Sequence, residues 1–289
     1  MNDALIIQIA NGTRFREMVS LYYDDLVAYC KLFQFDYWLH SGPVRYWDKD
    51  PLIPWAKLAL VQQAALQGYQ YIVYLDTDVF ISDPHVNLRD ACIKPVNMVR
   101  WWNKKPVTHL QGGVIYFNNT DNLVYQVTSY CLQESKYYLE RMPGLRGWYE
   151  QGQLTEMAGQ PTTEKFIGEI DVRFNWAEDF CPPCANPVIT SYHGIKPIEA
   201  VISRMKRDMK KRKRIASDAL WQLLKIVISV SNPEVMSKEL ESAVKYLIEE
   251  DIFSLEDDGT FTINDVVYKE IKLQVPGKLP FTLREIKEK

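Results

Sequence analysis

Residues 71–84 (YIVYLDTDVFISDP) constrain the fold more than any other stretch of the chain. The uncharged, mostly apolar residues 71–75 are typical of a strand buried on both faces. Asp76, Thr77 and Asp78 follow directly, and because alternate residues of a strand share a face, the two aspartates can point the same way. Two ionised carboxylates at the end of a buried strand repel each other and are costly to desolvate. A bound divalent cation removes that cost, whereas the alternative interpretation is a surface turn with two solvated aspartates.

The composition indicates an ordinary globular protein with a substantial core. The 289 residues are 47% hydrophobic and 25% charged, and the formal net charge of −3 gives no general attraction to nucleic acid or to an anionic membrane. The longest apolar run is shorter than the roughly 18–20 residues that span a bilayer. The first residues, MNDALIIQIA, carry an acidic residue and no cleavage-like site, and the five cysteines are scattered. We therefore expect a soluble, cytoplasmic protein.

Strand-like and helix-like segments alternate through the first two hundred residues, which predicts an α/β fold with a mostly parallel sheet. Strands are expected where short runs of β-branched and aromatic residues occur, and helices where apolar residues recur at spacings of three and four. The expected strands are 4–10, 35–40, 71–75, 96–100 and 113–117, and the expected helices are 13–31, 55–67 and 121–135.

A change of composition near residue 203 predicts a second region. We expect one domain over 1–203, a basic linker or helix over 204–214 (RMKRDMKKRKR), and a small appendage over 215–289. Two helical patterns and a hairpin at Asp258-Gly259 make this appendage mostly helical and compatible with a winged helix. The basic run is interpreted as a solvated face, with weak contact to a membrane surface as the alternative. Interleaved aromatic residues are lacking, so nucleic acid is not expected as a partner.

Several further segments carry side chains or backbone that suit a ligand site. Backbone groups at the end of the first strand could hold a nucleotide base, and paired glycines allow a ligand to approach the backbone closely. In chain order these segments are Ile9-Ala10-Asn11, Trp55-Ala56-Lys57, Gln111-Gly112-Gly113, Glu150-Gln151 and His193-Gly194-Ile195-Lys196.

These segments resemble the motifs of one enzyme family in the family's own order. The stretch 54–84 is similar to the W-x-K … D-x-D region of metal-dependent GT-A glycosyltransferases, and most of all to fungal galactosyl- and mannosyltransferases and plant xyloglucan xylosyltransferases. QGGVIYFNN (111–119) resembles a strand motif of that family, and YEQGQLTEM (149–157) its acidic-Gln segment. HGIKP (193–197) resembles its H-x-x-G-x-K-P motif with two residues missing. The resemblance implies a GT-A, Rossmann-like fold with flanking helices.

The resemblance also implies an activity. The chain would move a hexose or deoxyhexose from a nucleotide diphosphate sugar, with UDP favoured, to a hydroxyl of a carbohydrate acceptor. It would use Mn²⁺, with Mg²⁺ as the alternative. By resemblance Asp78 would ligate the metal, Asp76 would contact the ribose and the metal through water, and His193 would be a third ligand. The expected donor-binding residues are Ile9, Ala10, Asn11, Lys57, Asp76, Thr77, Gln111, Gly112, Gly113, Gly194 and Lys196.

The acceptor side has three candidate catalytic residues. Glu150 could act as general base in an inverting displacement, or the Gln151 amide could support the sugar face in a retaining reaction. The related enzymes retain configuration, and the sequence by itself leaves both open. Asp171 is a further candidate for acceptor contact or base, and a solvated loop glutamate is the alternative for Glu150. Trp148 or Trp176 is expected to touch a sugar ring.

Two other classes of function compete with sugar transfer. A non-catalytic module that binds nucleotide sugar or carbohydrate would have the same site residues. A D-x-D phosphatase is disfavoured, because that motif requires Thr or Val where this chain has Phe80 and normally lies on the first strand.

Overall fold

The computed structural model describes residues 2–41, 53–101, 109–141, 149–193, 197–210, 253–255, 260–263 and 266–269. The chain divides into two compact units, 1–206 and 207–289. The predicted domain boundaries at residues 203 and 214 stay predictions.

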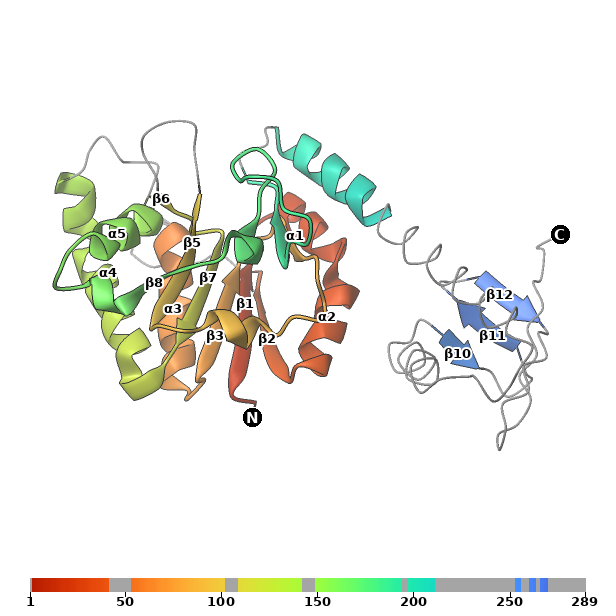
Figure 1. Cartoon of the computed structure of the whole chain (residues 1–289), viewed down its shortest axis with the longest axis horizontal. Coiled ribbons are helices and arrows are strands. Elements are labelled where there is room, and N and C mark those ends of the chain that lie inside the picture. The colour runs from red at the N-terminus through yellow and green to blue at the C-terminus, as the bar shows by residue number, and fades with distance from the viewer. Residues whose placement is uncertain are drawn as a thin grey trace. The chain divides into compact units, whose positions relative to one another are not determined.

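The first unit is built on a seven-stranded sheet in the order β2-β1-β3-β7-β5-β6, with β8 paired to β5 (Figure 1). Parallel pairs join β1 to β2 and β3, and β5 to β8, whereas β7 runs antiparallel to β3 and β5, and β6 antiparallel to β5. Most strands therefore share one direction, as the sequence predicts. The strands are β1 (Ala4–Ile9), β2 (Phe35–His40), β3 (Tyr71–Leu75), β5 (Val96–Trp101), β6 (His109–Leu110), β7 (Val114–Asn118) and β8 (Ile167–Ile170).

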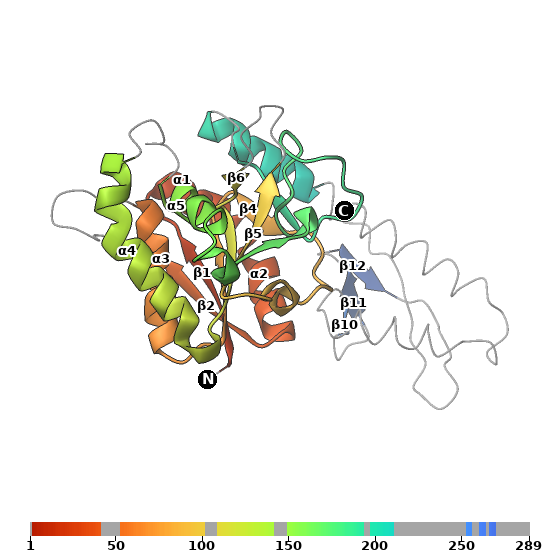
Figure 2. The same cartoon turned by 60° about the vertical axis from the view of Figure 1, so that its left-hand side comes forward.

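Helices cover both faces of this sheet, because the central strands are apolar on both sides. Helices α3 (Ile53–Leu66), α4 (Leu123–Arg141) and α5 (Tyr149–Ala158) pack against one another on one face, whereas α2 (Tyr23–Leu32) lies on the other (Figures 1 and 2). The short 3₁₀ helices are η1 (Leu88–Ala91), η2 (Thr120–Asn122), η4 (Glu164–Phe166) and η5 (Val172–Asn175).

The single helix predicted over 13–31 is wrong, because the chain forms α1 (Thr13–Ser20) and α2 with a break between them. The amides of Leu21 and Tyr22 bond three residues back instead of four, and Tyr22 leaves helical geometry with φ −130°. This break turns the buried Tyr22 hydroxyl toward Gln8 on β1. Apolar periodicity continues across the break, so the pattern gives no sign of it.

A two-stranded ribbon lies at the edge that carries the Asp-Thr-Asp motif. Strand β4 (Val79–Ile81) pairs antiparallel with β9 (Ile189–Ser191). The ribbon continues beyond its last pair, because the Tyr192 amide donates to the Asp78 carbonyl at 2.9 Å. The pairing therefore brings the segment before His193 to the metal-ligand candidates. Residues 198–210 are helical and include the start of the basic run.

The second unit contains an antiparallel three-stranded sheet of β10 (Phe253–Leu255), β11 (Thr260–Ile263) and β12 (Val266–Lys269). The β10–β11 pair confirms the hairpin predicted around Asp258-Gly259, and β12 is an additional strand. The two predicted helices between 215 and 250 lie outside the described residues. Within the described ranges, no helix is both long and apolar enough to cross a membrane.

Candidate functional site

Asp76 lies where β3 ends, and three uncharged protein groups hold it. Its amide donates to the Gly113 carbonyl at 2.8 Å, and the Tyr74 hydroxyl donates to its Oδ1 at 2.8 Å. The Gln8 side-chain amide donates to its backbone carbonyl at 3.2 Å. Gln8 is a fully buried polar residue within an otherwise apolar strand, which was the signal for this contact that the sequence offered.

Thr77 and Asp78 continue the same edge. The Tyr22 hydroxyl donates to the Thr77 carbonyl at 3.1 Å, and Tyr192 holds the Asp78 carbonyl. Burial, and after it the neighbouring charge of Asp76, raise the pKa of Asp78 to about 7. The two aspartates thus have the electrostatic conflict that the sequence predicts, and their oxygen donors suit a hard divalent cation.

Lys57 is buried beneath these carboxylates at the first turns of α3. Its Nζ lies 2.9 Å from Glu150 Oε1 and 3.5 Å from Asp76 Oδ1, and it donates to the Gly112 carbonyl at 2.9 Å. Burial alone would lower the pKa of Lys57, but the attraction of Asp76 and Glu150 outweighs it and the pKa rises. Protein oxygens thus surround the ammonium that was predicted to bind the donor.

The two glycines before β7 lie against these same side chains. A Cβ added to Gly112 would lie 2.7 Å from Glu150 Oε1, and one added to Gly113 would lie 3.4 Å from Asp76 Oδ2. The Gly112 amide donates to Gln151 Oε1 at 2.9 Å. Close approach of protein carboxylates therefore accounts for a small residue at Gly112, a cause that the sequence did not suggest.

Gln111 is buried beside these glycines. Its Nε2 lies 2.7 Å from His109 Nε2, and its buried Oε1 has no hydrogen-bond partner among the described residues. Such an oxygen suits a polar ligand group.

Glu150 and Gln151 belong to the first turn of α5 and not to a loop. Glu150 is only 4% exposed, so the alternative of a solvated loop glutamate is wrong. Trp55 anchors α3 to α5, since its indole N–H donates to Gln153 Oε1 at 3.0 Å and its ring meets Tyr149 edge-on. The tryptophan of the W-x-K motif is thus a packing residue that sets the position of Lys57.

His193 is exposed, and its ring lies edge-to-face on Trp101 with centroids 5.4 Å apart. In the part of the chain that the structure describes, no three His, Cys, Asp or Glu side chains form a group that could hold a metal. The role of His193 as third ligand stays a prediction. Gly194 and Lys196 lie outside the described residues.

The remaining candidates belong to the end of β1 and to the N-terminal end of η5. The Ala10 amide already donates to the His40 carbonyl at 2.8 Å, and Ile9 is buried, while Asn11 is half-buried. Asp171 is exposed and caps η5, where its Oδ1 accepts from the Arg173 amide at 2.8 Å. No contact of Asp171 with Asp76 or Glu150 is found among the described residues.

Of the two tryptophans expected to touch a sugar, Trp176 belongs to the described residues. Trp176 is half-buried, and its indole N–H donates to the Pro182 carbonyl at 2.9 Å. Trp148 lies outside the described residues. Contact of either ring with a sugar stays a prediction.

Comparison with known proteins gives a likeness in structure and none in sequence. The sequence matches no protein-family model, and a search of curated proteins finds no match. A glycosyltransferase involved in the glycosylation of the major capsid of PBCV-1 superposes with a TM-score of 0.51 at 13% identity, over 71% of this chain and 99% of that one.

Two further solved structures are similar at lower scores. They are the glycosyltransferase GlyE of Streptococcus pneumoniae TIGR4 (TM-score 0.46, 10% identity, 74% of this chain and 64% of that one) and apo mouse xyloside xylosyltransferase 1 (0.43, 8%, 67% and 99%). At these identities the likeness speaks for the fold alone. By its likeness to the first of the three structures, the chain has the fold of a GT-A-type glycosyltransferase.

Proposed function

We propose that the chain is a metal-dependent glycosyltransferase that moves a hexose or deoxyhexose from a nucleotide diphosphate sugar to a hydroxyl of a carbohydrate acceptor. UDP is the favoured nucleotide. The observation that carries the proposal is the pair Asp76 and Asp78 at the end of β3, where burial and mutual repulsion leave Asp78 in need of a proton or a cation. In open α/β sheets this edge is where ligands bind.

The donor set suits Mn²⁺ or Mg²⁺. Asp78 and Asp76 would supply carboxylate oxygens, and an imidazole from His193 would favour Mn²⁺. When bound, such an ion supplies Lewis-acid stabilisation of the charge that develops on a departing diphosphate. The protein prepares the site beforehand, because Tyr74 and Lys57 fix the Asp76 carboxylate in place.

On the acceptor side, we do not assign Glu150 the role of general base. Glu150 is buried and paired with Lys57, so in this proposal it neutralises that ammonium and positions it. Gln151 holds the Gly112 amide through its Oε1, which supports a role at the donor face. This arrangement is compatible with a retaining reaction, in which no protein carboxylate needs to take the acceptor proton.

The decisive experiment measures release of nucleotide diphosphate by the full chain from a panel of UDP- and GDP-sugars, with Mn²⁺ or with EDTA. We expect Mn²⁺-dependent release from at least one donor, and loss of at least a hundredfold in Asp78→Ala. Asp90→Asn, which changes an exposed carboxylate on η1, is the matched control and should be unaffected.

Three results would count against the proposal. Unchanged Mn²⁺-dependent release by Asp78→Ala would remove the metal role. A melting temperature that no nucleotide diphosphate raises in Mn²⁺ would remove the donor site. Donor binding without release or transfer would identify a non-catalytic binding module instead.

A further inference from the structure

A hollow lies beside the edge strand β2, on the face of the sheet that carries α3. Its volume is about 410 Å³, within the range of about 300–1,000 Å³ that is usual for small-molecule sites. Ile7 and Leu60 give it an apolar floor, and Trp38, His40, Gln63 and Gln67 give it a polar wall. None of the described residues that were predicted to bind the donor lines it.

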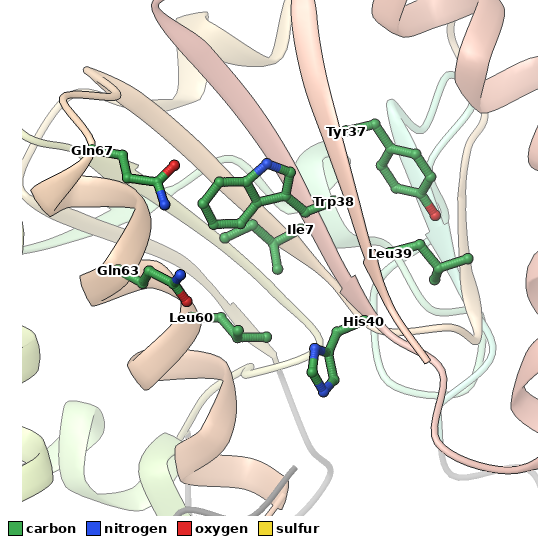
Figure 3. A pocket seen from close by; sticks show the side chains of 8 residues that line it. All are labelled: Ile7, Tyr37, Trp38, Leu39, His40, Leu60, Gln63 and Gln67. Atoms are coloured by element: carbon green, nitrogen blue, oxygen red, sulfur yellow. The ribbon is translucent and has the colours of Figure 1, made fainter. Parts of the chain in front are cut away.

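The periodicities of the strand and of the helix explain why these side chains face the same hollow. Trp38 and His40 are alternate residues of β2, and Trp38 is in register with Ile7 of β1. Gln63 lies on α3 and Gln67 directly follows its last residue, and the Gln67 backbone amide donates to the Gln63 carbonyl at 3.1 Å. The two side chains are therefore one helical turn apart and lie on the same side of the helix. Figure 3 shows the indole, the imidazole and both amides directed toward the gap between strand and helix.

The aromatic wall is held in a fixed orientation. The ring of Trp38 meets Tyr69 edge-on with centroids 5.6 Å apart, and the Tyr69 hydroxyl donates to Asp36 Oδ2 at 2.7 Å. Trp38 is only half-buried despite these contacts. A rigid aromatic ring that keeps part of its surface open is suited to stacking against a ligand.

Three polar side chains of the hollow have groups without a hydrogen-bond partner among the described residues. His40 Nε2 is buried and has no hydrogen-bond partner within the described ranges. The amides of Gln63 and Gln67 likewise make no hydrogen bond there and are exposed. Buried polar atoms are nearly always paired in native proteins, so an unpaired imidazole nitrogen beside a cavity points to a ligand group.

The described residues of the lining favour one class of ligand. Among them there is no Lys or Arg to attract a phosphate and no Asp or Glu to hold a metal cation. A ligand that is neutral, has one face for an aromatic ring and carries several hydroxyl groups matches the indole, two amides and imidazole. A sugar ring has these properties.

We propose that the hollow between β2 and α3 is a second carbohydrate-binding site, which holds a neutral sugar unit apart from the donor site. Gln63 is six residues from Lys57 along α3, about 9 Å at 1.5 Å per residue. The proposal does not depend on glycosyl transfer, because it rests on residues that take no part in the predicted donor or metal site.

The test is a titration of the full ¹⁵N-labelled chain in EDTA, followed through the tryptophan indole signals, with Trp38→Phe used to assign Trp38. The probes are glucose, galactose, mannose, xylose and N-acetylglucosamine, with uridine and guanosine as the competing class. We expect at least one sugar to shift the Trp38 signal saturably, and the double variant Q63A/Q67A to weaken that binding at least tenfold. Gln133→Ala, an exposed glutamine on α4, should bind as the wild type does.

Each other outcome would overturn the proposal. A nucleoside that shifts Trp38 while no sugar does would identify a base-binding site. A sugar that binds Q63A/Q67A as tightly as the wild type would place it elsewhere, and no shift with any probe would mean that the hollow takes none of these ligands. Both glutamines are exposed, so their replacement is expected to leave the fold intact, which thermal unfolding of Q63A/Q67A checks.

Discussion

Glu150 Oε1 lies 2.9 Å from Lys57 Nζ, and both side chains are almost completely buried. The same ammonium reaches Asp76 Oδ1 at 3.5 Å and donates to the Gly112 carbonyl at 2.9 Å. One charge therefore ties α3, α5, the end of β3 and the turn before β7 together. The carboxylate proposed to meet the metal is held by a group that solvent does not reach.

Removing this ammonium should be costly. We expect Lys57→Met to destabilise the protein by about 3–5 kcal/mol, because it leaves Glu150 buried without its partner. The free energy of unfolding from urea titration measures this change.

Lys206 provides the matched control for that variant. Its Nζ lies 2.9 Å from Glu17 Oε1, the same distance as in the buried pair, but both side chains are largely exposed. Lys206→Met should therefore change stability by less than about 1 kcal/mol. If the two substitutions changed the free energy of unfolding equally, the burial of Lys57 would not determine its contribution to stability.

Gly112 should tolerate a methyl group less well than Gly113. The added Cβ of Gly112→Ala would lie 2.7 Å from Glu150 Oε1, which cannot move away without breaking its contact with Lys57. We expect a loss of about 1–3 kcal/mol for Gly112→Ala, as for other overpacked sites. The cost at Gly113 should be smaller, because its nearest neighbour would be at an ordinary contact distance of 3.4 Å. Thermal unfolding of both variants measures the difference, and a larger loss at Gly113 would contradict this account.

The sequence predicted the parts of the fold that have strong local patterns. The apolar run 71–75 and the aspartates after it are where the pattern places them, because burial on both faces leaves an unmistakable signal. The separation of α1 from α2 was missed, since the break at Tyr22 serves contacts of its hydroxyl with Gln8 and with the Thr77 carbonyl, which is 55 residues further along the chain. Contacts of that kind depend on tertiary structure and leave no local pattern.

The candidate site shows the same division. The order of the motifs predicted that Lys57, Asp76, Gly112 and Glu150 belong to one site. In the structure Lys57 contacts the other three. The role of Lys57 could not be predicted, because a sequence does not show whether a lysine is exposed for donor binding or buried in an ion pair. Tyr74 and Gln8 were missed as site residues. A tyrosine within a buried strand is most simply interpreted as core, and a glutamine among apolar residues does not show which group it will bond.

Asp171 should behave as a helix cap and not as a catalytic residue. Asn caps helices about as well as Asp, so Asp171→Asn should keep both stability and nucleotide-sugar turnover. Asp171→Ala should lose about 0.5–2 kcal/mol of stability with turnover retained, because the Arg173 amide loses its acceptor. Urea unfolding and a turnover assay on both variants distinguish the roles. A hundredfold loss of turnover in Asp171→Asn would restore the catalytic interpretation.

The pH dependence of the metal-free protein should reveal Asp78. Its folded pKa of about 7 lies above the ordinary value of 3.8, because of burial and the charge of Asp76. The folded state therefore keeps a proton that the unfolded chain has lost, so this group's contribution to stability is greatest at low pH and is lost as pH rises from about 4 to about 7. Carbon NMR of ¹³C-labelled aspartate, with Asp78→Asn for assignment, measures the titration directly.

Two changes should move this titration in a known direction. Asp76→Asn should lower the pKa of Asp78 without returning it to 3.8, because repulsion is removed while burial remains. Added Mg²⁺ should lower it further, since a bound cation competes with the proton, and cation affinity should accordingly rise with pH and level off above about 7. Titration of Asp78 near pH 4 in the metal-free protein, or cation affinity that does not change between pH 5 and 8, would contradict the proposed metal site.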